Sequence, residues 1–258
     1  MKVIEANHVY KVFGRRPSDG VKKLKAGKTR DQLRKSGQTA AVIDTSFDVD
    51  KGEIFVVMGL SGSGKSTLIR MVNGLLPITA GNMTLYGEDL AHVSKSKLRE
   101  LRRERVSMVF QNFALLPHRT VGENAAYGLE IQGVGRSERE RRAKEALSLV
   151  GLEGWGGYKP GELSGGMRQR VGLARALAAE TDILLMDEAF SALDPLIRRE
   201  MQDQLIDLQG KLGKTILFIT HDLNEAMRLG DRIAMMRDGR VEQVGTAEEI
   251  LRDPASDY

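Results

Sequence analysis

A glycine-rich turn, GLSGSGKST at residues 59–67, constrains the fold of this chain more than any other feature. The apolar run before it, residues 54–58, predicts a buried strand, and the segment after it begins a helix. Four residues separate the first glycine from the Gly-Lys-Ser triplet, which is the spacing of a phosphate-binding loop. In such a loop Lys65 places a charge near the outer phosphates and the Ser66 hydroxyl binds magnesium. We therefore expect an α/β chain that binds a nucleoside triphosphate, rather than a glycine-rich turn that matches by accident.

Composition agrees with an enzyme whose fold does not depend on disulfide bonds. The chain has 258 residues, enough for one large domain with an ample core. Zero cysteines exclude disulfides, thiolate metal sites and a cysteine nucleophile, so a metal must be bound through oxygen or imidazole ligands. The sequence contains no run of about 20 apolar residues and does not open with a signal peptide. We expect a cytoplasmic chain, unless a partner holds it at a membrane.

The net charge of +4 is unevenly distributed, because residues 15–35 hold nine basic and two acidic side chains. Such a segment is most often a solvated loop, although it could also contact anionic lipid or nucleic acid. It contains no aromatic residue on which bases could stack, which makes nucleic acid the weaker option. Anionic lipid remains the partner to consider for residues 15–35.

Apolar patterning predicts further strands and helices around the turn. Residues 183–186 and 215–220 are apolar throughout, which is typical of strands covered on both faces. Alternation over residues 43–49 predicts a half-exposed strand, and residues 83–86 predict a short one. Two further strands flank Asp238-Gly239, a strong hairpin turn. Capping-box spacing predicts helix starts at Ser137 with Glu140 and at Thr246 with Glu249. Residues 113–178 look mostly helical.

Two acids end the predicted strand 183–186, namely Asp187 and Glu188. At a phosphate site, one carboxylate can hold magnesium while the next polarises the attacking water as general base. Alone, paired acids after a strand are usually helix N-terminal charges. Together with a phosphate loop they favour nucleotide hydrolysis.

Residues 163–170, LSGGMRQR, place a serine and two glycines before a predicted helix. This pattern either forms a second anion-binding helix start or is an ordinary cap and turn. With this segment the chain resembles the ATP-binding cassette ATPases of membrane transporters over nearly its whole length. The family's motifs occur in order, as residues 59–67, Gln111, 163–166, Asp187-Glu188, 191–194 (Ser-Ala-Leu-Asp) and His221.

The resemblance implies a P-loop NTPase core of RecA type, with a mostly parallel sheet, an N-terminal antiparallel β subdomain and an inserted α-helical lobe. We expect a single ATP-binding domain over 1–258, with its core at 1–111 and 178–258. The lobe would occupy 112–177, and residues 14–42 would form a basic insertion.

The resemblance also implies site residues and partners. ATP and Mg²⁺ would be bound by two copies that sandwich two nucleotides. The adenine would stack on Phe13, with Tyr10 as a weaker candidate. Met167 departs from the glutamine common at that position, which puts a side-chain hydrogen bond there in doubt. The implied roles are: catalytic, Glu188, His221, Gln111 and Lys65; ATP-binding, Phe13, Gly59, Leu60, Ser61, Gly62, Ser63, Gly64, Lys65, Ser66 and Thr67; contacts to the ATP of the partner copy, Ser164, Gly165, Gly166, Met167 and Asp194; metal, Ser66, Gln111 and Asp187.

A narrower resemblance is to the ATPases of quaternary-amine importers, which take up glycine betaine, proline betaine or choline. Residues 58–61, 113–118, 163–177 and 186–198 carry it, together with the insertion after Phe13. It implies permease subunits docked near residues 112–128, a substrate-binding protein as an indirect partner, and a place at the cytoplasmic face of the inner membrane. That family commonly adds C-terminal regulatory domains, so either this chain is naturally short or the sequence is part of a longer protein.

Three alternatives stay open at this stage. They are an importer ATPase for methionine, another amino acid or a polyamine, a cassette ATPase that acts outside transport, and a nucleotide-gated adaptor that does not hydrolyse.

Overall fold

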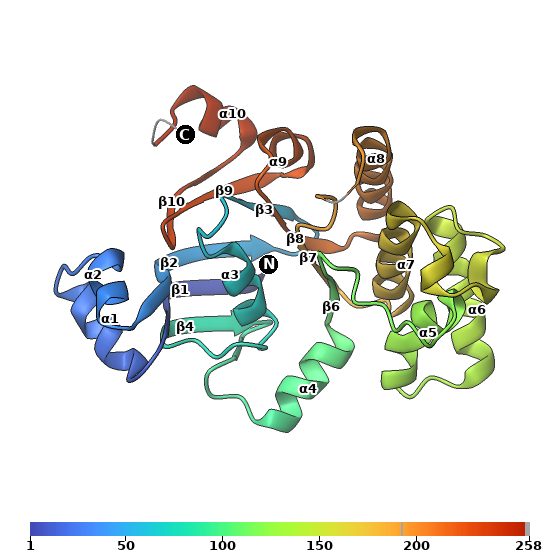
Figure 1. Cartoon of the computed structure of the whole chain (residues 1–258), viewed down its shortest axis with the longest axis horizontal. Helices are drawn as coiled ribbons and strands as arrows, with labels where there is room; N and C mark the ends of the chain where they lie inside the picture. Colours follow the sequence, from blue (N-terminus) through green and yellow to red (C-terminus); the bar gives the residue numbers. More distant parts are fainter. Residues whose placement is uncertain (192, 256–258) are drawn as a thin grey trace. The chain divides into compact units, whose positions relative to one another are not determined.

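The computed structural model describes residues 1–191 and 193–255 (Figure 1). Ala192, part of the 191–194 motif, lies outside the described residues, as do positions 256–258. The chain divides into two compact units. The first unit comprises Met1 to Leu98 and the chain from Leu217 onward, and the second comprises Arg99 to Ile216. Across the described residues, the helices are too short or too polar to cross a membrane.

The first unit contains an antiparallel sheet of strand order β2-β1-β4-β5. Its longest strands pair from Lys2 with Asp50 to Phe13 with Thr39, so β1 and β2 form one long ribbon. The expected antiparallel subdomain is thereby confirmed, and the strands predicted at 43–49 and 83–86 lie within it. The bounds are β1 Lys2–Phe13, β2 Thr39–Asp50, β4 Ala80–Leu85 and β5 Glu88–Asp89.

Strands β10, β9, β3 and β8 are hydrogen-bonded neighbours in this order, and β3 is the buried strand that precedes the phosphate loop. Strands β3 and β9 are parallel, and β9 and β10 form the predicted hairpin around Asp238-Gly239. Every residue of β3 is buried, as its apolar run predicts. The bounds are β3 Ile54–Met58, α3 Lys65–Val72, α9 Leu223–Leu229, β9 Arg232–Arg237, β10 Arg240–Gly245 and α10 Ala247–Arg252. Two elements have residues in both units, namely α4 Lys95–Glu104 and β8 Thr215–Thr220.

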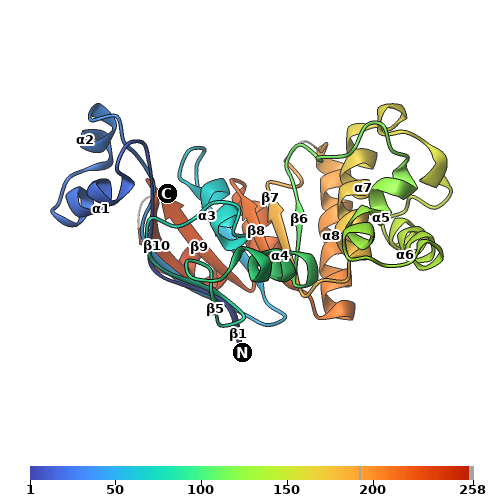
Figure 2. The same ribbon diagram turned by 90° about the horizontal axis from the view of Figure 1, so that it is seen from below.

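The basic insertion between β1 and β2 is folded and is not a loop. It forms α1 (Pro17–Lys25) and α2 (Arg30–Lys35), which stand beyond the end of β1 in Figure 2. Its apolar residues were outnumbered by lysines and arginines in the sequence, but Val21, Leu24 and Leu33 are buried. Thr29 and Gln32 form a capping box that starts α2. Three apolar anchors therefore suffice to fold a segment whose composition favours solvent.

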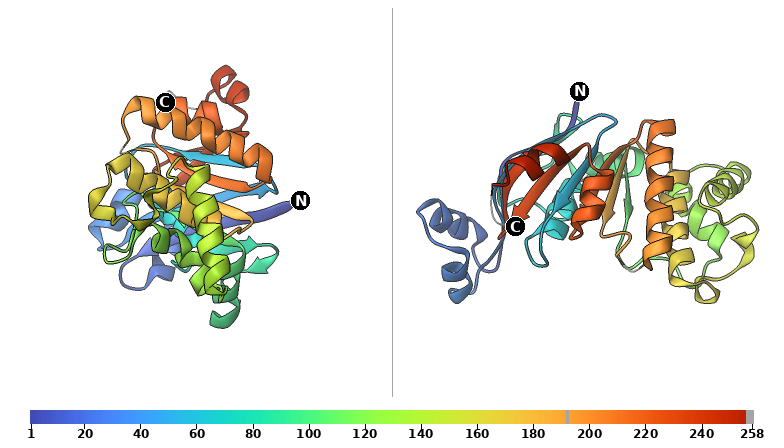
Figure 3. Two further views of the ribbon diagram at one scale, coloured as in Figure 1. Left: turned by 90° about the vertical axis from the view of Figure 1, so that its right-hand side faces the viewer. Right: turned by 90° about the horizontal axis from the view of Figure 1, so that it is seen from above.

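The second unit pairs two parallel strands, β6 and β7, with a group of helices. Helices α5, α6 and α7 pack against one another and appear in green to yellow in Figure 3. The helical character expected between Phe113 and Ala178 is confirmed. The bounds are β6 Val106–Val109, α5 Val121–Ile131, α6 Arg136–Leu149, η1 Trp155–Gly157, η2 Pro160–Glu162, α7 Gly165–Ala178, β7 Ile183–Asp187 and α8 Pro195–Leu212.

The expected helix starts are only partly correct. Thr246 and Glu249 form the capping box of α10. The prediction at Ser137 is wrong, because α6 begins one residue earlier and has Gly135 as its N-cap, without a side-chain cap. A capping box that the sequence analysis missed starts α5, where the Thr120 hydroxyl accepts from the backbone of Glu123. The Thr-x-x-Glu spacing at residues 120–123 is the sequence signal that could have predicted this helix start.

Candidate functional site

The phosphate loop follows β3 in the first unit, and two of its glycines have backbone torsions that favour glycine. Gly62 has φ 79° and Gly64 has φ 108°. A Cβ on Gly64 would lie 2.2 Å from the carbonyl oxygen of Ala41, and one on Gly59 would lie 2.1 Å from that of Met236. Neighbouring backbone thus fits closely around the loop. Glycine is therefore required at positions 59 and 64 because a side chain there would clash with neighbouring backbone.

Lys65 lies inside the turn and is only 4% exposed. Its Nζ donates to the carbonyl oxygens of Gly59, at 2.7 Å, and Leu60, at 3.1 Å. Next to it the Ser63 Oγ is buried without a hydrogen-bond partner among the described residues. Helix α3 begins at Lys65, two residues before Thr67, where the sequence predicts the helix start, and its N-terminal amides face the same turn. A buried cation, an unsatisfied hydroxyl and a helix N-terminus together fit an anionic ligand.

Phe13 ends β1 and keeps 38% of its surface exposed, so its ring is accessible to a partner. The Lys11 Nζ lies 5.0 Å from the centre of this ring and donates to the Pro77 carbonyl. Burial lowers the pKa of Lys11 below its ordinary value. Tyr10 is 5% exposed and belongs to the core under the insertion, so it is not available for stacking. Lys11 was missed by sequence reasoning, which gives no sign that a lysine packs under an aromatic ring.

His221 directly follows β8, in the same unit as the phosphate loop. It is exposed, and the chain beyond it turns at once into α9. The Asp222 side chain caps that helix by accepting from the amides of Asn224 and Glu225. The Thr220 hydroxyl accepts from the Asp222 amide, which fixes the turn on both sides of the histidine. The fold thus presents His221 at the end of a buried strand, as the sequence predicted.

Two further candidate residues meet in the second unit because β6 and β7 are parallel and in register. Val109 pairs with Met186, so the residues after each strand emerge at the same edge. There the Gln111 Nε2 lies 3.4 Å from a carboxylate oxygen of Glu188. Asp187, the last residue of β7, is 4% exposed. Gln111, distant in sequence, is thus brought to the same sheet edge as the consecutive residues Asp187 and Glu188.

Glu188 has φ 46°, a left-handed conformation that is uncommon for a residue with a side chain. Such strain costs about 1 to 3 kcal/mol and clusters at functional sites. The turn is held by Ser191, whose amide and hydroxyl both donate to the Glu188 carbonyl, at 3.2 and 2.9 Å. The carboxylate therefore projects from a rigid corner, which suits a group that must hold one water molecule in place.

The turn after Gln111 is strained as well, since Phe113 and Ala114 are both left-handed, at φ 58° and 48°. Arg175 of α7 binds their carbonyl oxygens, at 3.1 Å for Phe113 and 2.7 Å for Ala114. Burial lowers the pKa of this guanidinium from its ordinary value. Arg175 therefore ties α7 to the segment that follows Gln111. Sequence reasoning missed this residue, because nothing local connects two positions so far apart in the chain.

The LSGG segment forms the N-terminus of α7. Ser164 is the N-cap residue, and its hydroxyl accepts from the Met167 amide at 3.3 Å. Gly165, Gly166 and Met167 are half-buried, which leaves backbone of this turn accessible to a partner. Asp194 is similarly the N-cap of α8, where it accepts from the Ile197 amide at 3.1 Å. Both residues have a structural capping role, which for Ser164 was the plain alternative, and both also remain exposed.

The candidate metal ligands fit magnesium by their chemistry. Ser66, Gln111 and Asp187 offer a hydroxyl, an amide oxygen and a carboxylate, all hard oxygen donors. In the described part of the chain, no three His, Asp or Glu side chains gather into a metal-binding group. Magnesium takes few protein ligands when substrate phosphates complete its coordination. These residues are therefore compatible with Mg²⁺ bound together with a nucleotide.

A strand–loop–helix that fits an anionic ligand, a strained glutamate beside a glutamine, and an exposed LSGG helix start define the class of protein. Residues 42–191 match the family model described as ABC transporter, and the chain belongs to this family. It is 57% identical to the glycine betaine transport ATP-binding protein OpuAA of Bacillus subtilis, over 99% of this chain and 61% of OpuAA.

Similarity extends to another transport protein and to a solved structure. The chain is 56% identical to the glycine betaine/proline betaine transport system ATP-binding protein ProV of Escherichia coli, over 99% of this chain and 64% of ProV. It thus spans less than two thirds of the length of either relative. The post-hydrolysis dimer of the ATP-binding cassette MJ0796, bound to ADP and Pi, matches with a TM-score of 0.81 and 31% identity, over 95% of this chain and 98% of that one. The expected cassette fold is thereby confirmed.

Proposed function

We propose that this chain is the ATP-hydrolysing subunit of a membrane importer for a quaternary ammonium compatible solute, such as glycine betaine, proline betaine or choline. One observation carries the enzymatic part of this proposal. The Gln111 amide lies 3.4 Å from the Glu188 carboxylate at the ends of two paired strands, next to the buried Asp187. This arrangement suits hydrolysis better than mere nucleotide sensing, because a positioned carboxylate can accept a proton from water.

In phosphoryl transfer the protein mainly positions the reactants and neutralises charge. The amides of residues 59–67 and the Lys65 ammonium would hold the phosphates, since a triphosphate offers Lys65 stronger partners than the carbonyls it now binds. Phe13 would stack on adenine with its exposed face. Glu188 would take the proton of the attacking water, which Gln111 helps to orient. His221 would contact the terminal phosphate.

Magnesium would be held by Ser66 and Asp187, with Gln111 as a further ligand. When bound, the ion would neutralise charge on the outer phosphate oxygens. The Asp187 carboxylate is buried, so it keeps its oxygen donors in a fixed position.

We propose that two copies close around two ATP molecules. The dimeric ADP-bound and Pi-bound state of MJ0796 supports this arrangement. Ser164 to Met167 and Asp194 of one copy would face the phosphate loop of the other. ATP bridges the copies and so favours the closed dimer, while hydrolysis removes the bridge and lets it open. Permease subunits that bind the two states differently would convert this cycle into transport.

The permease contact would lie on the helical lobe, near residues 112–128. A cavity of about 880 Å³ opens there between α5, α6 and the segment around η1. Its lining mixes apolar surface, such as Ala126, Ala143 and Leu147, with charged side chains, such as Arg139 and Glu140. A short amphipathic helix of a permease fits such a lining. The boundaries of this lobe, 112–177 within a core of 1–111 and 178–258, remain a prediction.

The substrate class rests on the relatives, because the transported solute would not touch this subunit. OpuAA and ProV are named for glycine betaine and proline betaine transport. The alternative is an importer ATPase for another substrate, such as methionine, another amino acid or a polyamine. A subunit of this kind, together with its permeases and a substrate-binding protein, would work at the cytoplasmic face of the inner membrane as a peripheral protein.

Residues 15–35 offer a second contact, with anionic lipid. Lys22, Lys28 and Lys35 are exposed, whereas Lys23 donates to Gln38 and Lys25 lies over the Tyr10 ring. Salt would screen such a contact over about 10 Å at 0.1 M. Replacing the three exposed lysines by glutamine is expected to reduce co-sedimentation with vesicles that contain anionic lipid, and to leave binding to zwitterionic vesicles unchanged. Equal binding of variant and wild type to anionic vesicles would refute the contact.

The main experiment compares uptake of labelled glycine betaine, choline and methionine by cells that carry wild type, Glu188→Gln or Glu248→Gln. Glu248 is an exposed residue of α10 and serves as a matched control. We expect Glu188→Gln alone to abolish uptake of the quaternary amines and to spare methionine. Phosphate release by the purified proteins should fall about 100-fold or more in the same variant. Retained betaine and choline uptake would refute the proposed quaternary-amine substrate class. Retained phosphate release would refute the proposed catalytic role of Glu188.

A further inference from the structure

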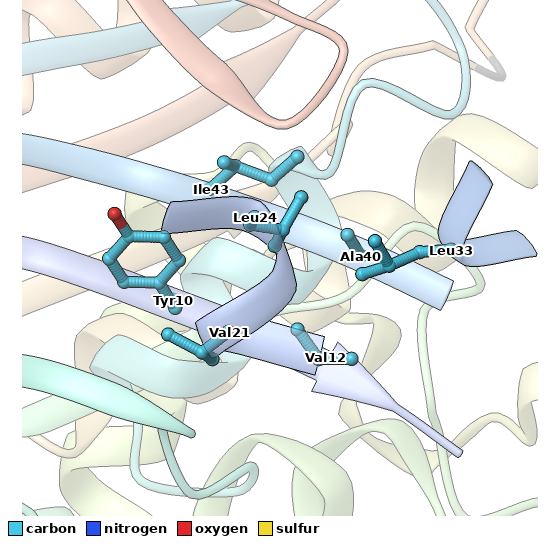
Figure 4. Packing of buried hydrophobic residues seen from close by; sticks show 7 residues of the cluster. All are labelled: Tyr10, Val12, Val21, Leu24, Leu33, Ala40 and Ile43. Atoms are coloured by element: carbon cyan, nitrogen blue, oxygen red, sulfur yellow. The ribbon is translucent and has the colours of Figure 1, made fainter. Parts of the chain in front are cut away.

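The basic insertion is anchored to the antiparallel sheet by a small core of its own. Val21 and Leu24 of α1 and Leu33 of α2 pack against Tyr10, Val12, Ala40 and Ile43, as Figure 4 shows. All seven side chains are buried to 6% exposure or less. The two helices are therefore fixed to β1 and β2, and a side chain on α2 has a defined position relative to that sheet.

The two ends of the insertion are also joined to each other by hydrogen bonds. The Gln38 side-chain amide donates to the carbonyls of Arg15 and Arg16, at 2.9 and 3.0 Å, while its oxygen accepts from Lys23 at 3.1 Å. Gln38 itself is 4% exposed. This buried amide ties the start of the insertion to its end, so movement of α1 and α2 on the sheet is restricted.

Arg30, the first residue of α2, reaches from the insertion to the phosphate loop. Its Nη2 donates to the carbonyl oxygen of Gly62 at 2.8 Å, and its Nη1 donates to the Asp238 carboxylate at 3.2 Å. Gly62 lies inside the glycine-rich turn, and Asp238 lies in the β9–β10 hairpin turn. One guanidinium thus joins three segments of the first unit that are distant in sequence.

Four carbonyls of the phosphate loop are bound by three different groups. Lys65 binds those of Gly59 and Leu60, Arg30 binds that of Gly62, and the Gly239 amide binds that of Ser63 at 2.9 Å. Because the peptide unit is planar and trans, a carbonyl fixed in one direction fixes the next N–H in the opposite one. The hairpin and Arg30 therefore determine how the loop's amides are presented.

We propose that Arg30 is a positioning residue for nucleotide binding: it makes the basic insertion an outer brace of the phosphate loop. The brace rests on the proposed function in one respect only, that residues 59–67 bind a nucleotide. The Asp238 carboxylate is 76% exposed, so the ion pair by itself contributes little. The charge-assisted bond to the Gly62 carbonyl is the stronger part of the contact.

The test is titration of the whole chain with a fluorescent ATP analogue. Arg30→Met removes the brace, Arg30→Lys restores a charge without the forked donors, and Arg34→Met is a matched control one turn further along α2, where the side chain is exposed. We expect Kd to rise about 3- to 10-fold in Arg30→Met, less in Arg30→Lys, and to stay at the wild-type value in Arg34→Met. At saturating ATP the kcat of Arg30→Met should equal that of wild type, because only uniform binding is lost.

A double-mutant cycle with Asp238→Asn distinguishes loss of the Arg30 contacts from general unfolding of the variant. Asp238 has φ 47°, which asparagine tolerates, so this change removes the carboxylate charge and leaves the turn intact. Asp238→Asn alone should change Kd little, since the exposed ion pair contributes little, and it should have no effect once Arg30 is gone. Equal Kd values for Arg30→Met and Arg34→Met would overturn the brace. If wild type and Lys65→Ala both failed to bind the analogue, the proposed function itself would fall, and the brace with it.

Discussion

At the scale of single residues, buried polar side chains of the candidate site can be compared with a buried polar side chain outside it. Lys65, Asp187 and Gln169 are all buried, although their side chains are polar or charged. Lys65 binds the carbonyls of its own turn, and Asp187 ends the strand next to Glu188. Gln169 differs from both, because neither polar atom of its amide has a hydrogen-bond partner within the described residues. A buried, unsatisfied amide is a cost to stability.

Replacing Gln169 by methionine should therefore stabilise the chain by about 1 kcal/mol, since methionine has a similar size and helix propensity. The matched control is Gln132→Met in the same unit. The Gln132 side-chain amide donates to the carbonyls of Arg103 and Ala179, at 2.9 and 3.0 Å. This control should lose about 1 kcal/mol. Denaturant midpoints measure both, and a loss of stability in Gln169→Met would show that its amide has a partner in the folded protein.

At the scale of elements, the phosphate loop depends on the strands and turns that surround it. Two of its glycines have positive φ but differ in their surroundings. A Cβ on Gly64 meets the Ala41 carbonyl, whereas one on Gly62 meets nothing within 4 Å. Steric clash with backbone cannot be relieved by moving a side chain, but torsional strain alone can be tolerated.

The two glycines are therefore expected to respond differently to alanine. Gly64→Ala should weaken nucleotide binding by about 100-fold or more, because the loop must move away from β2. Gly62→Ala should cost only the strain of a left-handed alanine, about 5-fold in affinity. Titration with the fluorescent ATP analogue compares them. Equal losses in the two variants would contradict the steric argument.

Elements whose signal is local could be predicted from the sequence. The phosphate loop, the buried strands 183–186 and 215–220 and the Asp238-Gly239 hairpin each depend on neighbouring residues, and the structure contains them all. The insertion helices were obscured, because three buried apolar residues decide their fold against nine basic ones. The Arg30–Gly62 bond joins an insertion to a loop through tertiary packing, and no spacing in the sequence encodes it.

At the scale of the whole molecule, the proposed dimer requires the backbone of the LSGG turn to be accessible to a nucleotide, whereas the fold of the single chain does not. A Cβ on Gly165 meets nothing within 4 Å, so the folded chain tolerates a larger residue there. The ATP of a partner copy would approach the same backbone. An added negative charge at Gly165 should consequently repel the phosphates and leave the monomer intact.

Light scattering on the Glu188→Gln protein measures this. With ATP and Mg²⁺ the variant should double its molar mass, because it binds nucleotide without hydrolysing it. Adding Gly165→Asp should keep it monomeric, whereas Gly161→Asp should not, because that glycine also has open space but precedes the turn. Dimers in the Gly165→Asp background would contradict the proposed interface.

The way the insertion leaves and rejoins the sheet has a consequence for the ancestry of such chains. Phe13 and Thr39 are register partners at the end of the β1–β2 ribbon, so the insertion starts and finishes at neighbouring points. A segment with adjoining ends can be spliced in or cut out while the β1–β2 pairing stays continuous, although its removal would uncover Tyr10, Val12, Ala40 and Ile43, which pack against it. Residues 14–38 are thus a module that evolution could acquire in one event, and that a protein engineer could replace with a two-residue Asn-Gly turn.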